Sequence, residues 1–252
     1  MKRLVHTCLL ATTVAAGCSS TDTATEADYD DVAQSLSAVV TAGSSSGDIG
    51  AMFDATTVAL GASEGLTFGA NAQGAYSGNS FGLNYTYKGT CHDAAGALLA
   101  KCGSSTDDAT IAVDWDGELS VLGLTASVER NGSWQLKNIQ SSPVELSGTS
   151  EFTLEASLQS LFRNATRTYH LTYEAEYAGV ELDRVARRIQ AGTVHYSIDA
   201  ERTVATARRE SEANFHMDGV LTFTGDGKAT LTLDKSFTYK IDPAKTTVEK
   251  ME

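Results

Sequence analysis

The stretch Thr168–Tyr177, TYHLTYEAEY, decides the fold, because apolar and polar side chains alternate along it without a break. One side of the stretch carries Tyr169, Leu171, Tyr173, Ala175 and Tyr177. The other side carries His170, Thr172, Glu174 and Glu176. Successive side chains of a β-strand point to opposite faces of its sheet, so the pattern predicts a strand with one buried face and one wet face.

The same period of two recurs from Leu83 almost to the end of the chain. It is found in residues 83–87, 111–115, 151–158, 194–200, 215–223 and 229–241. Asp116-Gly117, Asn131-Gly132 and Asp226-Gly227 are pairs that suit tight hairpin turns. The fold class expected is therefore mainly β: a large antiparallel, strongly twisted sheet, or a partly closed barrel or half-barrel of hairpins.

Two short helices are expected before the sheet. Residues 28–40 and 48–60 place apolar side chains at helical spacing, and three aspartates at the first helix start suit its dipole. We therefore expect a helical segment over residues 28–62, packed on an antiparallel β domain over residues 63–252. Residues 179–192 fit either a short helix or strand ends with a loop.

The composition indicates a globular protein and argues against one that binds nucleic acid. Hydrophobic residues make up 42% of the 252, which is enough for a core. Lysine and arginine total 19 against 32 acidic residues, for a net charge of −13. No long basic run occurs, so no nucleic-acid partner is expected.

The first residues, MKRLVHTCLLATTVAAGCSS, have the form of an export signal. Lys2 and Arg3 precede a short apolar run, and small residues lead to Cys18. This ending resembles the lipobox of bacterial lipoproteins, with Ala15 where that class prefers leucine.

The resemblance implies a signal peptide over residues 1–17 and acyl chains such as palmitate on Cys18. It also implies a lipid anchor in the outer membrane, on the periplasmic or cell-surface side, because Ser19 follows the cysteine. Residues 18–27 are small, polar and acidic, as expected of a flexible tether.

Two of the four cysteines remain for a disulfide. Cys8 leaves with the signal and Cys18 is the expected anchor, so Cys91 and Cys102 should pair in an oxidising compartment. The alternative is a metal site built from these two cysteines with His92 and Asp93.

No catalytic constellation is expected. Ser80 in GNSFG has the spacing of a nucleophile elbow, but a strand pattern follows it where that motif needs a helix. His170, His195 and His216 alternate onto the polar face, at positions that do not pair across strands. We therefore predict no catalytic residues, no metal and no cofactor.

Four aromatic side chains are candidate ligand contacts, if a curved sheet leaves a cavity on its apolar face: Tyr169, Tyr173, Tyr177 and Tyr196. The sequence thus favours a lipid-anchored, non-enzymatic structural or interaction module of the cell envelope, whose expected partner is an unknown envelope protein. The alternatives are a carrier or sensor of a lipophilic or aromatic ligand and, less favoured, a serine hydrolase at Ser80.

Overall fold

A computed structural model describes residues 22–41, 47–61, 75–80, 82–121, 123–162, 166–206, 209–245 and 247–251. Its strands form one antiparallel sheet in which neighbours along the chain are neighbours in space. The strands are β1 Ala75–Ser80, β2 Leu83–His92, β3 Asp108–Val121, β4 Leu124–Lys137, β5 Val144–Gln159, β6 Thr166–Asp183, β7 Arg188–Thr206, β8 Arg209–Phe223, β9 Ala229–Leu233, β10 Phe237–Asp242 and β11 Thr247–Lys250.

The sheet remains open, because its edge strands do not meet. β1 pairs with β2, β11 pairs with β10, and the order runs from β1 to β11 without a crossover. The predicted antiparallel meander is confirmed, as is the strand at Thr168–Tyr177, which lies within β6. Residues 179–192, which fitted either a helix or strand ends with a loop, are strand ends joined by a turn: β6 continues to Asp183, and β7 begins at Arg188.

Bulges bend the long central strands. The register between β5 and β6 shifts between Leu146 and Gly148, and that between β6 and β7 shifts near Ala178 and Glu181. Gly148 has φ +144°, and a Cβ there would lie 2.2 Å from the carbonyl oxygen of Ser133. A bulge adds a residue to one strand and increases its local twist, so these sites help the sheet to curve around its apolar face.

Two of the three expected hairpin turns are wrong. Asp116-Gly117 lies within β3 and Asn131-Gly132 within β4, where Val113 pairs with Gly132. Glycine is needed at position 117 because the backbone comes close to a neighbouring segment there: a Cβ would lie 2.2 Å from the carbonyl oxygen of Gly82. Asp226-Gly227 does lie in the connection between β8 and β9.

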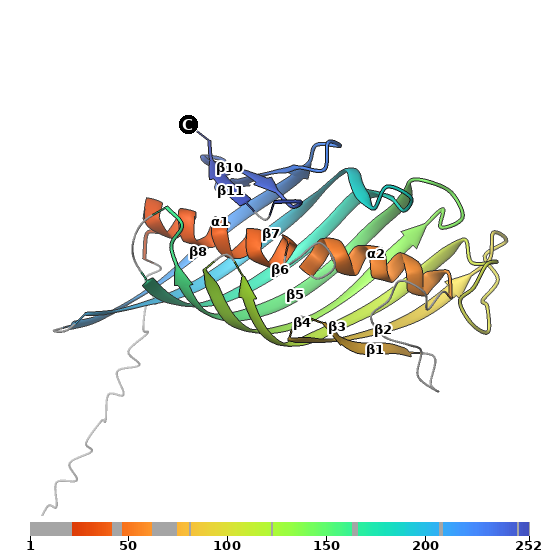
Figure 1. Ribbon diagram of the computed structural model, residues 1–252, viewed down its shortest axis with the longest axis horizontal. Helices are drawn as coiled ribbons and strands as arrows, with labels where there is room; N and C mark the ends of the chain where they lie inside the picture. Colours follow the sequence, from red (N-terminus) through yellow and green to blue (C-terminus); the bar gives the residue numbers. More distant parts are fainter. Residues whose placement is uncertain are drawn as a thin grey trace, which may run out of the picture.

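The two predicted helices are present as α1 Glu26–Thr41 and α2 Gly47–Ala59. Figure 1 shows them one after the other along the concave side of the curved sheet. α1 lies near β9, β10 and β11, whereas α2 lies near β2 and β3. Most residues of both helices are buried, as expected of helices enclosed by a curved sheet. No helix in the described ranges has the length and apolar character needed to cross a bilayer.

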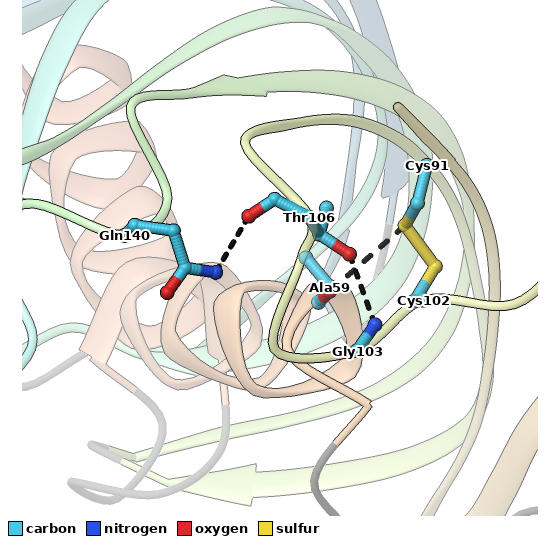
Figure 2. Close-up of a disulfide and its surroundings, with 6 residues drawn as sticks. All are labelled: Ala59, Cys91, Cys102, Gly103, Thr106 and Gln140. Atoms are coloured by element: carbon cyan, nitrogen blue, oxygen red, sulfur yellow. Dashed lines mark hydrogen bonds between the residues drawn. A yellow bond between two sulfur atoms is a disulfide. The ribbon is translucent and has the colours of Figure 1, made fainter. Parts of the chain in front are cut away.

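The predicted Cys91–Cys102 disulfide is present and holds the long connection between β2 and β3 (Figure 2). The sulfur of Cys91 lies 3.9 Å from the carbonyl oxygen of Ala59, the last residue of α2. Within the same connection, Thr106 accepts a hydrogen bond from Gly103 N through its hydroxyl, 2.9 Å, and one from Gln140 through its carbonyl, 2.6 Å. The disulfide loop therefore joins the end of α2 to two strand connections.

The expected signal peptide and Cys18 lie outside the described residues. Of the expected tether, Asp22 is hydrogen-bonded through its backbone to Asn214 of β8, and Glu26 already belongs to α1.

Candidate functional site

The concave face of the sheet is the part of the molecule where most buried polar groups meet. Tyr169, Tyr173 and Tyr177 come every fourth residue along β6, so all three point to that face. All are buried, and so is Tyr196 of β7. The four aromatics singled out from the sequence thus share one face, but the first three bond the helices.

The three β6 hydroxyls contact the helix pair from the first half of α1 to the start of α2. Tyr169 donates to the Asp31 carboxylate of α1 at 2.9 Å. The Tyr173 and Ser35 hydroxyls lie 2.5 Å apart, and Tyr177 donates to Asp48 of α2 at 2.6 Å. Burial raises the pKa of Tyr173 and Tyr169, so both remain neutral donors. This tyrosine row fixes the position of both helices along the sheet.

Asp28 is the most heavily bonded acid at the start of α1. Its carboxylate accepts from the backbone N–H of Thr25 at 2.8 Å, which is one half of a capping box, and from the Thr25 hydroxyl at 2.6 Å. Arg202 of β7 donates to the same carboxylate at 2.6 Å, and Arg167 of β6 lies 3.8 Å away. Burial works to raise the pKa of Asp28, but the bonds from Thr25 and Arg202 outweigh it and lower that pKa.

The neighbouring acids of α1 also bond to sheet residues. Arg167 donates to Asp31 at 2.9 Å, and Asp30 accepts from Tyr239 of β10 at 2.8 Å. Lys250 of β11 lies 2.9 Å from Asp30. The sequence interpretation of these aspartates as dipole partners was therefore incomplete, because their carboxylates are buried against cations and hydroxyls of four strands.

A second ionic contact holds the start of α2. Arg130 of β4 forms a fully buried ion pair with Asp48. The same guanidinium donates to Ser150 at 3.0 Å and to Tyr177 at 2.5 Å, and it lies 4.4 Å from the ring centroid of Trp115. A buried charge is tolerated only where it is paired and hydrogen-bonded, and Arg130 satisfies both conditions.

Chemically, the concave face is a set of donors that bind carboxylates, and the carboxylates belong to the chain's own helices. Some donors remain unused: the Tyr196 hydroxyl and Trp134 Nε1 are buried without a hydrogen-bond partner among the described residues. Burial raises the pKa of Tyr196 well above its ordinary value, so this group also stays neutral.

The convex face of the sheet is solvent-exposed and strongly acidic. We define the outer acidic face by its exposed carboxylates: Asp114, Asp116, Glu118, Glu129, Glu151, Glu155, Glu174, Glu176, Asp199, Glu201 and Asp218. Three cross-strand rows run over it, from Asp114 to Asp218, from Asp116 to His216 and from Glu118 to Asn214. None of these rows contains lysine or arginine, so the face carries unbalanced negative charge.

Two pairs of like charges stand directly opposite each other on the outer acidic face. Asp116 of β3 faces Glu129 of β4, and Glu151 of β5 faces Glu174 of β6. Directly opposed like charges destabilise a sheet. A shallow hollow of about 690 Å³ crosses this region, lined among others by Glu151, Glu174 and His195.

The three histidines are on the convex face, as predicted, and each lies beside acids. His170 lies 3.6 Å from Glu155, and His195 is paired across the strands with Glu176. His216 is 3.0 Å from Asp199, which raises the pKa of its imidazole. Among the described residues, no group of three or more histidine, cysteine, aspartate or glutamate side chains is arranged to hold a metal ion.

Ser80 lies at the end of β1 and pairs with Leu83 of β2, so this segment is a hairpin. A nucleophile elbow needs a strand, a sharp turn and a helix, and the element after Ser80 is a strand.

Sequence reasoning missed the cations of the concave face. Each of the three arginines is two residues from a buried residue of its own strand and therefore lies on the same face of the sheet. The pairs are Arg130 with Val128, Arg167 with Tyr169, and Arg202 with Ala200. A charged residue at an inward position is the signal that predicts a buried pair, and it was available from the alternation alone.

No family model, curated protein or solved structure matches the chain.

Asp28 allows a first prediction. Asp28→Asn should lower the free energy of unfolding by about 2–3 kcal/mol at neutral pH, because Arg202 loses its charged partner and the amide has one acceptor oxygen where the carboxylate has two. A lowered folded-state pKa stabilises above the unfolded value near 3.9 and loses that contribution as pH falls through the folded value. The gap between wild type and variant in urea unfolding should therefore shrink in acid. Asp108→Asn, at an exposed site, is the control; a gap independent of pH would contradict the assignment.

Proposed function

We propose that this protein is a lipid-anchored, non-enzymatic interaction module of the bacterial cell envelope that binds a cationic partner with its outer acidic face. The observation that carries the proposal is that like charges stand directly opposite each other on neighbouring strands, Asp116 opposite Glu129 and Glu151 opposite Glu174. Contacts that oppose folding are expected where function requires them. A cationic partner would relieve this repulsion, which gives the face a reason to remain acidic.

The occupied concave face supports the same proposal. Its tyrosines and arginines already bond the helices, so an external partner meets the convex face first. The anchor is proposed at Cys18 from the lipobox resemblance, with outer-membrane placement. Labelling cells with radioactive palmitate should mark the wild type and leave Cys18→Ser unlabelled; equal labelling would remove the anchor from the proposal.

Binding of a labelled deca-lysine peptide to the Cys18→Ser protein tests the acidic face. Glu151→Gln should weaken binding several-fold and, by removing a like-charge contact, stabilise the fold by about 0.2–1 kcal/mol. The matched control is Glu249→Gln of β11, which faces Lys240 and should leave binding unchanged while slightly destabilising the fold. Affinity should also fall as salt rises. Equal effects of the two substitutions on binding would refute a specific role for the outer acidic face.

A second candidate function is a carrier or sensor of a lipophilic or aromatic ligand on the concave face. One observation favours it: the buried Tyr196 hydroxyl lacks a partner among the described residues. The ligand would need the helix pair to move, because three hydroxyls of β6 now bond α1 and α2.

A further inference from the structure

A separate small pocket opens at the end of the sheet where α1 stops and α2 begins. Its volume is about 190 Å³. The turn between β6 and β7, the connection between β8 and β9, and the turn after β10 meet there with both helices. Its lining includes Ile49, Arg187, Arg188, Ile189, Phe223 and Pro243.

The walls of the pocket are mostly apolar. Ile49 of α2, Phe223 of β8 and Pro243 after β10 line it, together with the buried Ile189 of β7. Pockets for drug-sized ligands span roughly 300–1,000 Å³, so this one suits a small molecule or the end of a longer chain. An apolar group of a few carbon atoms would be withdrawn from water there, which favours binding.

Two arginines, Arg187 and Arg188, line the pocket, and neither has a close two-bonded carboxylate partner among the described residues. Arg188 meets Asp183 only through its Nε, at 3.9 Å, while Asp183 already accepts hydrogen bonds from Val185, Ala186 and Gln190. Two other nearby acids, Asp226 and Asp242, have lysine partners at 3.3 Å and 3.5 Å.

Arg187 is also available for a ligand. Its guanidinium lies 5.2 Å from the ring centroid of Phe53, and no hydrogen bond or ion pair joins it to another described residue. Arg187 also interacts electrostatically with the buried Asp54, and burial raises the pKa of Asp54 to about 6 in spite of Arg187. A carboxyl group with that pKa is still mostly ionised at pH 7, so Asp54 partly offsets the charge of Arg187, but it forms no ion pair with Arg187.

We propose that this pocket binds a small monocarboxylate, whose apolar tail lies against Ile49, Phe223 and Pro243 and whose carboxylate pairs with Arg187 and Arg188. A guanidinium binds a carboxylate with two parallel hydrogen bonds, and such charge-assisted bonds are stronger than neutral ones. The ligand would contact α1, α2 and three turns at once, so its binding also holds the helix pair on the sheet. This site is independent of the outer acidic face.

Calorimetric titration with hexanoate and with hexanol, its neutral match, tests the proposal. Hexanoate should bind at least tenfold more tightly than hexanol and should raise the melting temperature. Arg188→Gln and Arg187→Gln should each reduce hexanoate affinity about tenfold or more and leave hexanol unchanged. Phe223→Trp, which fills the pocket, should weaken both ligands.

Arg184→Gln is the matched control, because Arg184 belongs to the same turn, bonds Ser141 and does not line the pocket. Its affinity for hexanoate should equal that of the wild type. No hexanoate binding by the folded wild type, equal binding of the acid and the alcohol, or equal losses in the Arg184 and Arg188 variants would each overturn the proposal. Because the readout is a monocarboxylate and not deca-lysine, its failure leaves the proposed function untouched.

Discussion

Replacing Arg130 by methionine should lower the free energy of unfolding by about 3–5 kcal/mol, the usual effect of leaving one partner of a buried ion pair alone. The substitution leaves the Asp48 carboxylate inside the protein with Tyr177 as its remaining donor. It also removes the cation from beside Trp115 and Trp134, whose ring centroids lie 4.4 Å and 5.2 Å from it. Urea unfolding followed by circular dichroism measures the loss.

The double variant Arg130→Met with Asp48→Leu distinguishes the loss of the ion pair itself from the cost of leaving one buried charge without a partner. Replacing a buried ion pair by apolar side chains of similar size is often neutral, so the double variant should be far more stable than Arg130→Met alone. The hydroxyls of Ser150 and Tyr177 already share a hydrogen bond at 3.3 Å, which the double variant can keep. Arg184→Met in an exposed turn is the control and should change stability little. Additive losses from the two single substitutions would contradict a coupled pair.

Removing the disulfide by Cys91→Ala with Cys102→Ala should cost about 3 kcal/mol, because the bridge restricts the unfolded chain across a separation of 11 residues. The folded protein should also lose contacts at the end of α2, since the bridge packs against Ala59 (Figure 2). Thermal unfolding of the variant and of the reduced wild type should agree. Equal stability of oxidised and reduced protein would show that the bridge does not support the fold.

The parts of the fold that depend on the spacing of apolar side chains within one strand or helix could be predicted from the sequence. Alternation placed Tyr169, Tyr173 and Tyr177 on one buried face, and the cysteine count gave the Cys91–Cys102 pair. Helical spacing gave both helices to within a few residues. These predictions succeed because the pattern of buried and exposed side chains within one strand or helix is visible in its own sequence.

The predictions that failed depend on contacts between distant elements. Asp116-Gly117 was assigned to a turn because its chemistry suits one, but pairing with Asn84 and Leu83 of β2 places it within a strand. Asp28 and Asp31 were assigned to the helix dipole, whereas their main partners are arginines more than 130 residues away. The like-charge contacts of the convex face also appear only once the register is known.

Native-state hydrogen exchange of α1 and α2 tests most directly whether the helix pair is a fixed part of the sheet's core. If the tyrosine row and the Arg130–Asp48 pair hold the helices, peptides covering residues 26–41 and 47–59 should exchange only by global unfolding, with the same free energy as β5, β6 and β7. Exchange of both helices at a clearly lower free energy, while those strands remain protected, would contradict it. The helices would then act as a removable cover, and the ligand-carrier function would be favoured over the interaction module.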